Sequence, residues 1–236
     1  MKGSWWKAPL LIGTYFLARL LLELEVLQLG IANSDRVPML AEIVDASVLM
    51  SYFAEAEWFY HLQALLLFLA LLLMMRLLKF KLFDFKALSW RGVGQTFLIY
   101  VAFFVIQQGL GFIIETFVPS YTEPANQQAV ISMVSQMNPV LMFANIVILT
   151  PIIEEIVCRG LVMKYTFSLM PVVGALSSVL FFTWLHSPGN WIDFLIYGVL
   201  SAGITFVYWH SRKLEYAILF HVIQNLFGFI AIYLVQ

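Results

Sequence analysis

The sequence predicts an all-α protein, a polytopic bundle of about seven transmembrane helices, with six to eight as the range. Of its 236 residues, 62% are hydrophobic and only 11% are charged, a composition far from that of soluble globular domains. Apolar runs long enough to cross a bilayer core of about 30 Å recur along the whole chain, and most charges stand between them. We therefore expect residues 1–236 to form a single integral membrane domain.

The first apolar run, from about Trp5 to Gly30, is predicted to be a retained helix rather than a cleaved signal peptide. It is long, contains charged residues and has no small-residue cleavage site. Arg19 and Glu23 lie four residues apart, so they can pair on one helical face and lower the cost of both charges in lipid. The acidic connection from Ile31 to Glu57 then has apolar residues at helical spacing. This predicts an amphipathic helix on the membrane surface, with a lid over a cavity as the alternative.

Six further helices follow in the predicted order. The segment from Pro119 to Asn138 is read as a connection without lysine or arginine. The second and third helices cover about Trp58 to Leu78 and Gly94 to Val118, and the last four begin at Leu141, Pro171, Trp191 and Glu215.

The positive charges predict the orientation of the bundle. Cytoplasmic connections of membrane proteins are enriched in lysine and arginine. If the N-terminus is cytoplasmic, the outer side holds only Arg36, and Arg19 lies within the first helix. The inner side then holds eleven of the thirteen basic residues, namely Lys2, Lys7, Arg76, Lys79, Lys81, Lys86, Arg91, Arg159, Lys164, Arg212 and Lys213.

Two adjacent carboxylates and an arginine interrupt the fourth apolar run, in the stretch from Pro151 to Gly160. Glu154, Glu155 and Arg159 each cost about 2.5 to 3.5 kcal/mol at the centre of a membrane helix, so three together indicate a functional site. Arg159 follows Glu155 by four residues, which is the spacing of a pair on one helix face. Glu154 is then the freer carboxylate.

Two histidine motifs are expected to meet this carboxylate pair. Glu154 and His186 are each sixteen positions from Met170, so in an antiparallel hairpin they should lie at equal depth and face each other. His221 and Asn225 are four residues apart in the last helix and project toward the same place. Phe182, four residues before His186, completes the set.

These residue types suit hydrolysis of an amide by water without a serine or cysteine nucleophile. A carboxylate beside a histidine can hold and deprotonate a water, while a second histidine and an asparagine can donate hydrogen bonds to an oxyanion. Zinc is the competing explanation, because two histidines and a glutamate can ligate it. The motif HExxH is absent and Cys158 is the only cysteine. We therefore expect no metal and no cofactor, and metal-free hydrolysis is the favoured chemistry.

In their order and spacing, the motifs resemble those of a known family, over about Leu141 to Phe229. Glu154-Glu155-x-x-x-Arg159, Phe182-x-x-x-His186 and His221-x-x-x-Asn225 are similar to the signature of the CAAX protease and bacteriocin-processing family. This is also called the Abi or type II CAAX prenyl endopeptidase family. Before Leu141 the chain resembles it only in having membrane helices. The resemblance divides the chain into variable N-terminal helices, 1–138, and a motif-bearing catalytic core, 139–236.

This resemblance implies an intramembrane glutamate protease. Glu154 would activate water with His186, and His221 and Asn225 would form the oxyanion site. Glu155 and Arg159 would hold the arrangement. The expected substrate is a short hydrophobic, prenylated or leader-type peptide, or a lipidated protein, as in CAAX processing or bacteriocin processing. The expected location is a bacterial plasma membrane, with lipid as a partner and no nucleic acid.

Two other functions remain open at this point. The chain could be a non-enzymatic immunity or peptide-binding protein of the same family. A proton-coupled transporter is less favoured, because the sequence has no inverted repeat and no pair of broken helices in corresponding halves. The sequence leaves open the substrate, its prenylation, the face to which a cavity opens and the oligomeric state.

Overall fold

The computed structural model describes residues 6–34 and 46–235, which form helices joined by short connections, without a strand among them. Five helical stretches are long and apolar enough to span a membrane. They are α3 (Glu57–Leu77), α4 (Trp90–Phe117), the run Pro139–Thr166, α9 (Trp191–Ser211) and, within α10 (Leu214–Val235), Leu214–Leu234. The predicted all-helical membrane fold is confirmed.

Two further helices, α1 and α8, lie in the bundle but are not among these five. Helix α1 (Lys7–Asn33) has 27 residues but carries Arg19, Glu23 and Glu25 along its length. The two predicted partners pair, with Arg19 Nε donating to Glu23 Oε1 at 2.7 Å. Helix α8 (Pro171–Leu185) has 15 residues, which is about 22 Å and shorter than a bilayer core.

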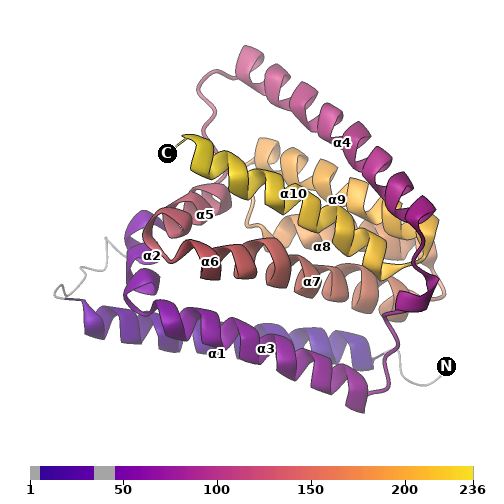
Figure 1. Ribbon diagram of the computed structural model, residues 1–236, viewed down its shortest axis with the longest axis horizontal. Helices are drawn as coiled ribbons and strands as arrows, with labels where there is room; N and C mark the ends of the chain where they lie inside the picture. The colour runs from indigo at the N-terminus through magenta and orange to yellow at the C-terminus, as the bar shows by residue number, and fades with distance from the viewer. Residues whose placement is uncertain (1–5, 35–45, 236) are drawn as a thin grey trace.

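Consecutive long helices alternate in direction across the bundle, as Figure 1 shows. Helices α1 and α3 lie side by side along one side, and α4 crosses the opposite side. The run Pro139–Thr166 lies between them, in contact with α1, α3, α8 and α10. It therefore holds the middle of the molecule.

This central run changes its helical geometry around Pro151. It consists of α6 (Pro139–Met142), the π-helical segment η2 (Phe143–Leu149), α7 (Thr150–Glu155) and the π-helical segment η3 (Ile156–Thr166). Proline has no N–H and its ring clashes with the carbonyl four residues before it, so the helix widens ahead of Pro151. π-Helical geometry often occurs at functional sites, and here two π-helical segments flank the helix that carries the two glutamates.

Two short helices, α2 (Ala46–Glu55) and α5 (Ala125–Gln136), pack against each other at one end of the bundle. The first favours the alternative of a helix that covers a cavity: Tyr52 and Phe53 are buried, and Phe53 lines the cavity. The predicted helix residues before Ala46 lie outside the described residues. The second corrects the reading of residues 119–138 as a connection, because Val130, Met133 and Val134 form an apolar stripe that packs inward.

The positive charges gather at the opposite end of the bundle. Apart from Arg19 and Arg159, every described lysine and arginine stands at or beside the helix ends that carry Lys7, Arg76, Arg91, Lys164 and Arg212. A short 3-10 turn, η1 (Phe85–Ala87), lies in this region. We call it the basic end. Arg36 and Lys2 lie outside the described residues, and the cytoplasmic placement of the N-terminus stays a prediction.

Candidate active site

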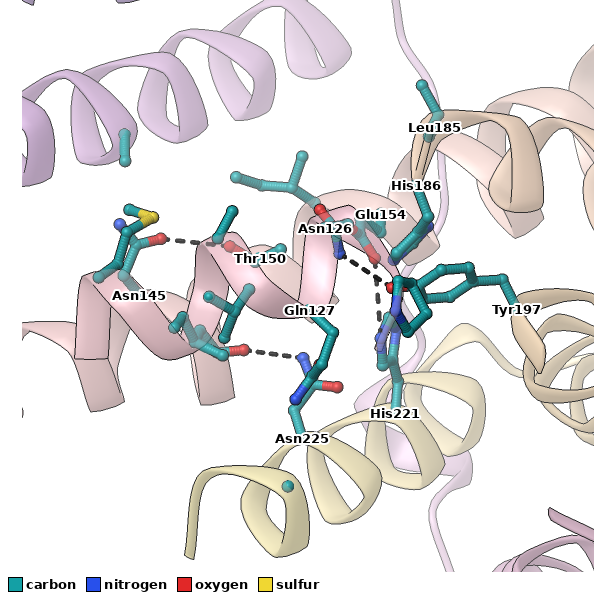
Figure 2. A pocket seen from close by; sticks show the side chains of 18 of the residues that line it. Asn126, Gln127, Asn145, Thr150, Glu154, Leu185, His186, Tyr197, His221 and Asn225 are labelled. Carbon is teal, nitrogen blue, oxygen red and sulfur yellow. Dashed lines mark hydrogen bonds and ion pairs between the residues drawn. The ribbon is translucent and has the colours of Figure 1, made fainter. Parts of the chain in front are cut away.

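A cavity of about 610 Å³ is lined by α1, α3, α5, α9, α10 and the central run, and α7 presents Glu154 to it. Glu154 is 18% exposed at its side chain, whereas Glu155 is fully buried. The two adjacent glutamates therefore differ in environment, because successive residues of a helix point in different directions. His186, His221 and Asn225 line the same cavity, so the structure brings the four predicted catalytic residues together (Figure 2).

Glu155 forms the predicted pair with Arg159 inside the bundle. Arg159 Nη1 donates to Glu155 Oε1 at 3.0 Å, and neither side chain is exposed. Arg159 Nη2 donates to the Ser201 carbonyl at 2.8 Å, to its hydroxyl at 2.9 Å and to Thr205 Oγ1 at 3.1 Å. Breaking a buried ion pair by removing one partner is costly, so this network fixes η3 against α9.

The Phe182 ring covers the same guanidinium. Arg159 Cζ lies 5.0 Å from the ring centroid, within the range of a cation–π contact. The same ring contacts His186 at 4.4 Å and His221 at 5.5 Å between centroids. Phe182 is itself fully buried. This residue therefore spaces the two histidines and shields the arginine from the cavity.

His221 stands between the two glutamates. Its Nδ1 lies 2.9 Å from Glu155 Oε1, and its Nε2 lies 3.7 Å from Glu154 Oε2. Glu155 also accepts from Arg159, so it is assigned as a carboxylate that accepts the Nδ1 proton of His221. A carboxylate that holds one imidazole nitrogen directs the other toward the reacting groups. The distance of 3.7 Å is too long for a direct hydrogen bond.

His186 ends α8 and is held by its own helix. Its Nδ1 lies 2.8 Å from the Phe182 carbonyl oxygen, which can only accept, so Nδ1 carries the proton. Its ring also packs on Tyr197 at 4.4 Å between centroids. In the neutral ring Nε2 is then an acceptor. No hydrogen bond joins His186 to Glu154, although Figure 2 shows both on the same side of the cavity.

Asn225 faces the π-helical part of the central run. Its Nδ2 donates to the carbonyl of Ile146 at 2.9 Å. In a π-helix the backbone N–H and C=O groups pair five positions apart rather than four. A different set of backbone carbonyls is then free to accept from a side chain. The amide of Asn225 is thus oriented by the backbone, and one of its two N–H groups remains for another acceptor.

Several residues of the cavity wall, or of the network behind it, were missed by the sequence reasoning. Ser201 and Thr205 hold Arg159, and their four-residue spacing on α9 was a signal that the sequence contained. Tyr197 and Asn126, joined at 3.4 Å, carry no comparable signal, because they are far apart in the sequence and belong to no motif. Asn145 and Thr150 form another polar pair in the cavity wall, at 3.2 Å.

Among the residues described, no three His, Cys, Asp or Glu side chains are grouped so that they could hold a metal ion. Cys158 is free and fully buried, away from the cavity lining.

Comparison with known proteins identifies a matching family model and two relatives. Residues 136–227, which include all four predicted catalytic residues, match the family model described as type II CAAX prenyl endopeptidase Rce1-like. This confirms the resemblance drawn from the motifs. The chain is 29% identical over 157 residues to UPF0177 protein YaiF of Lactococcus lactis subsp. lactis (strain IL1403), covering 61% of this chain and 66% of that protein.

A second relative comes from the same strain. UPF0177 protein YvdC is 27% identical over 92 residues, covering 39% of this chain and 35% of that protein. The chain thus spans less than two thirds of the length of either relative. No solved structure matches the chain.

Proposed function

We propose that this chain, whose C-terminal half matches the Rce1-like endopeptidases, is an intramembrane peptidase that hydrolyses a peptide bond with a water activated by Glu154. One observation carries the proposal. Of two adjacent glutamates, Glu155 is neutralised by Arg159, while Glu154 reaches a cavity that it shares with two histidines and an asparagine. An unpaired carboxylate at this depth is costly and indicates function.

The charges of the site define its resting state. Glu155 and Arg159 cancel, so Glu154 and His221 together are neutral when one proton, besides that on His221 Nδ1, is held by Nε2 or by the Glu154 carboxylate. Water placed between His221 Nε2 and Glu154 Oε2 would complete the contact across 3.7 Å. The pair can then accept a proton and return it, which is the requirement for general acid–base catalysis.

The reaction follows from these positions. Glu154 takes a proton from water as the water oxygen forms a bond to the scissile carbonyl carbon, and His186 Nε2 accepts a hydrogen bond from the same water. The tetrahedral intermediate then collapses, and the C–N bond breaks as Glu154 gives the proton to the leaving amine. No covalent enzyme intermediate is formed.

The developing oxyanion faces donors from α10. His221, with Nδ1 held by Glu155, can donate from a protonated Nε2, and Asn225 has one N–H not used by Ile146. Donors fixed before the reaction stabilise such charge strongly in a low-dielectric site. Removing one comparable donor costs about 10²- to 10³-fold in turnover.

The rest of the cavity suits an apolar peptide. Its wall includes the apolar residues Leu49, Phe53, Leu67, Val130 and Met133. A pocket of about 610 Å³ lies within the range of about 300 to 1,000 Å³ that is common for ligand sites. We propose as substrate a short hydrophobic peptide segment, with or without an attached lipid, in a bacterial plasma membrane with the N-terminus of the enzyme cytoplasmic.

The proposal is tested by comparing peptide termini in host membranes that contain the wild-type chain or Glu154→Gln at matched levels. Termini generated only by the wild-type chain are expected, because glutamine is close in shape but cannot accept the proton. The candidate substrates are then synthesised and tested with the purified chain.

A matched control for this comparison is Glu115→Gln, in α4 outside the cavity lining, which should leave the termini unchanged. Identical termini in the wild-type and Glu154→Gln membranes, with both proteins folded, would favour the alternative of a membrane immunity or peptide-binding protein.

A further inference from the structure

A second cavity, of about 210 Å³, lies at the basic end, away from the catalytic residues. It is enclosed by the end of η3, the start of α8 and the end of α9. Its lining consists of Met163, Lys164, Ser168, Pro171, Tyr208 and Arg212. The proposed catalysis uses none of these side chains.

Two cations border this cavity. Lys164 Nζ donates one hydrogen bond, to the Lys81 carbonyl at 2.6 Å, and an ammonium has two further donors. The Arg212 guanidinium stacks at 4.6 Å on the Trp209 ring, and no described residue accepts a hydrogen bond from it. Stacking leaves the planar edge of the guanidinium free, and that edge matches a phosphate in geometry.

The two neighbouring carboxylates, Asp84 and Glu215, each accept at least one hydrogen bond from another group. Asp84 Oδ2 accepts from Lys213 Nζ at 2.6 Å, and Glu215 Oε1 accepts from the backbone N–H of Asp84. Neither carboxylate lines the cavity. Lys164 and Arg212 therefore present positive charge to it without a facing carboxylate.

Neutral donors converge on the same space. Tyr208 is only 5% exposed, and no described residue bonds to its hydroxyl, although the side chain borders the cavity. Ser168 adds a second hydroxyl without a described partner. Pro171 begins α8, so the first N–H groups of that helix lie beside the cavity, where a helix N-terminus favours an anion.

The surroundings of the cavity are apolar and exposed. Leu169 is 88% exposed, Met170 52% and Val172 62%. Such residues beside a cationic pocket at a helix end are typical of the level where lipid headgroups meet acyl chains. Soluble phosphate alone would not need this apolar rim.

We propose that this pocket binds the phosphate group of an anionic phospholipid in the leaflet at the basic end. Arg212 and Lys164 would hold the phosphate oxygens, and Tyr208 would donate from the pocket floor. The Leu169–Val172 rim would contact the acyl chains. This site is independent of the proposed peptidase activity. Tyr208 stands one turn after Thr205, so bound lipid would also restrain the helix that holds Arg159.

The experiment measures phosphatidylglycerol bound to the purified full chain in neutral micelles, by mass spectrometry of the intact protein as the lipid is titrated. Arg212→Gln and Tyr208→Phe are each expected to weaken retention, Arg212→Gln by about tenfold, the size of one lost charge-assisted hydrogen bond. Arg91→Gln is the matched control, because Arg91 is exposed at the same end and lines neither cavity. Melting curves verify that each variant is folded.

Two results would overturn the proposal. Equal lipid retention by Arg212→Gln, Tyr208→Phe and Arg91→Gln would show attraction by diffuse charge rather than a site. Displacement of the lipid by an equal concentration of inorganic phosphate would assign the pocket to a soluble ligand. Retention that resists inorganic phosphate and depends on Arg212 supports the lipid site.

Discussion

Helices α4 and α9 are both apolar enough to cross a membrane, yet they differ in how much of each is buried and in what each contributes to the site. In α4, 11% of the most apolar 18-residue window is buried inside the protein, against 56% in α9. Helix α9 binds Arg159 through Ser201 and Thr205, whereas α4 contributes only Gln107 to the cavity lining among the described residues. Hydropathy therefore finds both spans, but small and polar residues show which one supports the site.

The largest expected effect comes from removing the cation that α9 binds. Arg159→Met leaves Glu155 buried without its main partner, so the free energy of unfolding should fall by about 3 to 5 kcal/mol. Unfolding in mixed micelles, followed by circular dichroism, measures this loss.

The control is the double variant Arg159→Met with Glu155→Gln. Removing the stranded charge should recover part of the lost stability, because the neutral amide costs less to bury. A single-variant loss below about 1 kcal/mol would mean that the pair contributes no more than a surface ion pair.

A pair of glycine substitutions compares the two helices directly. A Cβ at Gly203 of α9 would lie 2.8 Å from the ring of Phe103 and 3.1 Å from Phe220, so Gly203→Ala should cost about 1 to 3 kcal/mol by overpacking. At Gly111 of α4 nothing lies within 4 Å, and Gly111→Ala should stabilise the helix by about 0.5 to 1 kcal/mol. Equal effects at both positions would contradict the packing of α9 against α4.

A smaller effect is expected from one hydroxyl of α9. Thr205→Val keeps the shape but removes one of three acceptors for Arg159 Nη2, so stability should fall by about 0.5 to 1.5 kcal/mol. Phe206→Leu, on the exposed face of the same helix, should change stability by less than about 0.5 kcal/mol. The same unfolding titration measures both. A larger loss of stability for Phe206→Leu would show that the buried face of α9 has been assigned incorrectly.

Much of this arrangement could be predicted because membrane helices follow local rules. Apolar runs predicted the ends of the long helices to within a few residues. The four-residue spacing predicted the Arg159–Glu155 and Arg19–Glu23 ion pairs. The convergence of Glu154, His186, His221 and Asn225 followed from hairpin depth and helix faces.

The parts that could not be predicted depend on tertiary packing. Counting positions assumed a regular α-helix, but the central run is π-helical on both sides of α7. His221, rather than His186, is the histidine within 3.7 Å of Glu154, because crossing angles between α7, α8 and α10 decide that choice. The helical spacing of α2 was visible in the sequence, but its packing against α5 was not, and the short helix α5 was read as a connection.

The most direct measurement compares Glu154→Gln and Glu155→Gln in the reconstituted chain, with cleavage of the identified peptide and unfolding measured on the same samples. Glu154→Gln should reduce cleavage by about 10²- to 10⁴-fold and change stability by less than about 0.5 kcal/mol. Glu155→Gln should lower both, because its carboxylate holds Arg159 and His221. Cleavage retained by Glu154→Gln at the wild-type rate would contradict the division of roles between these adjacent glutamates.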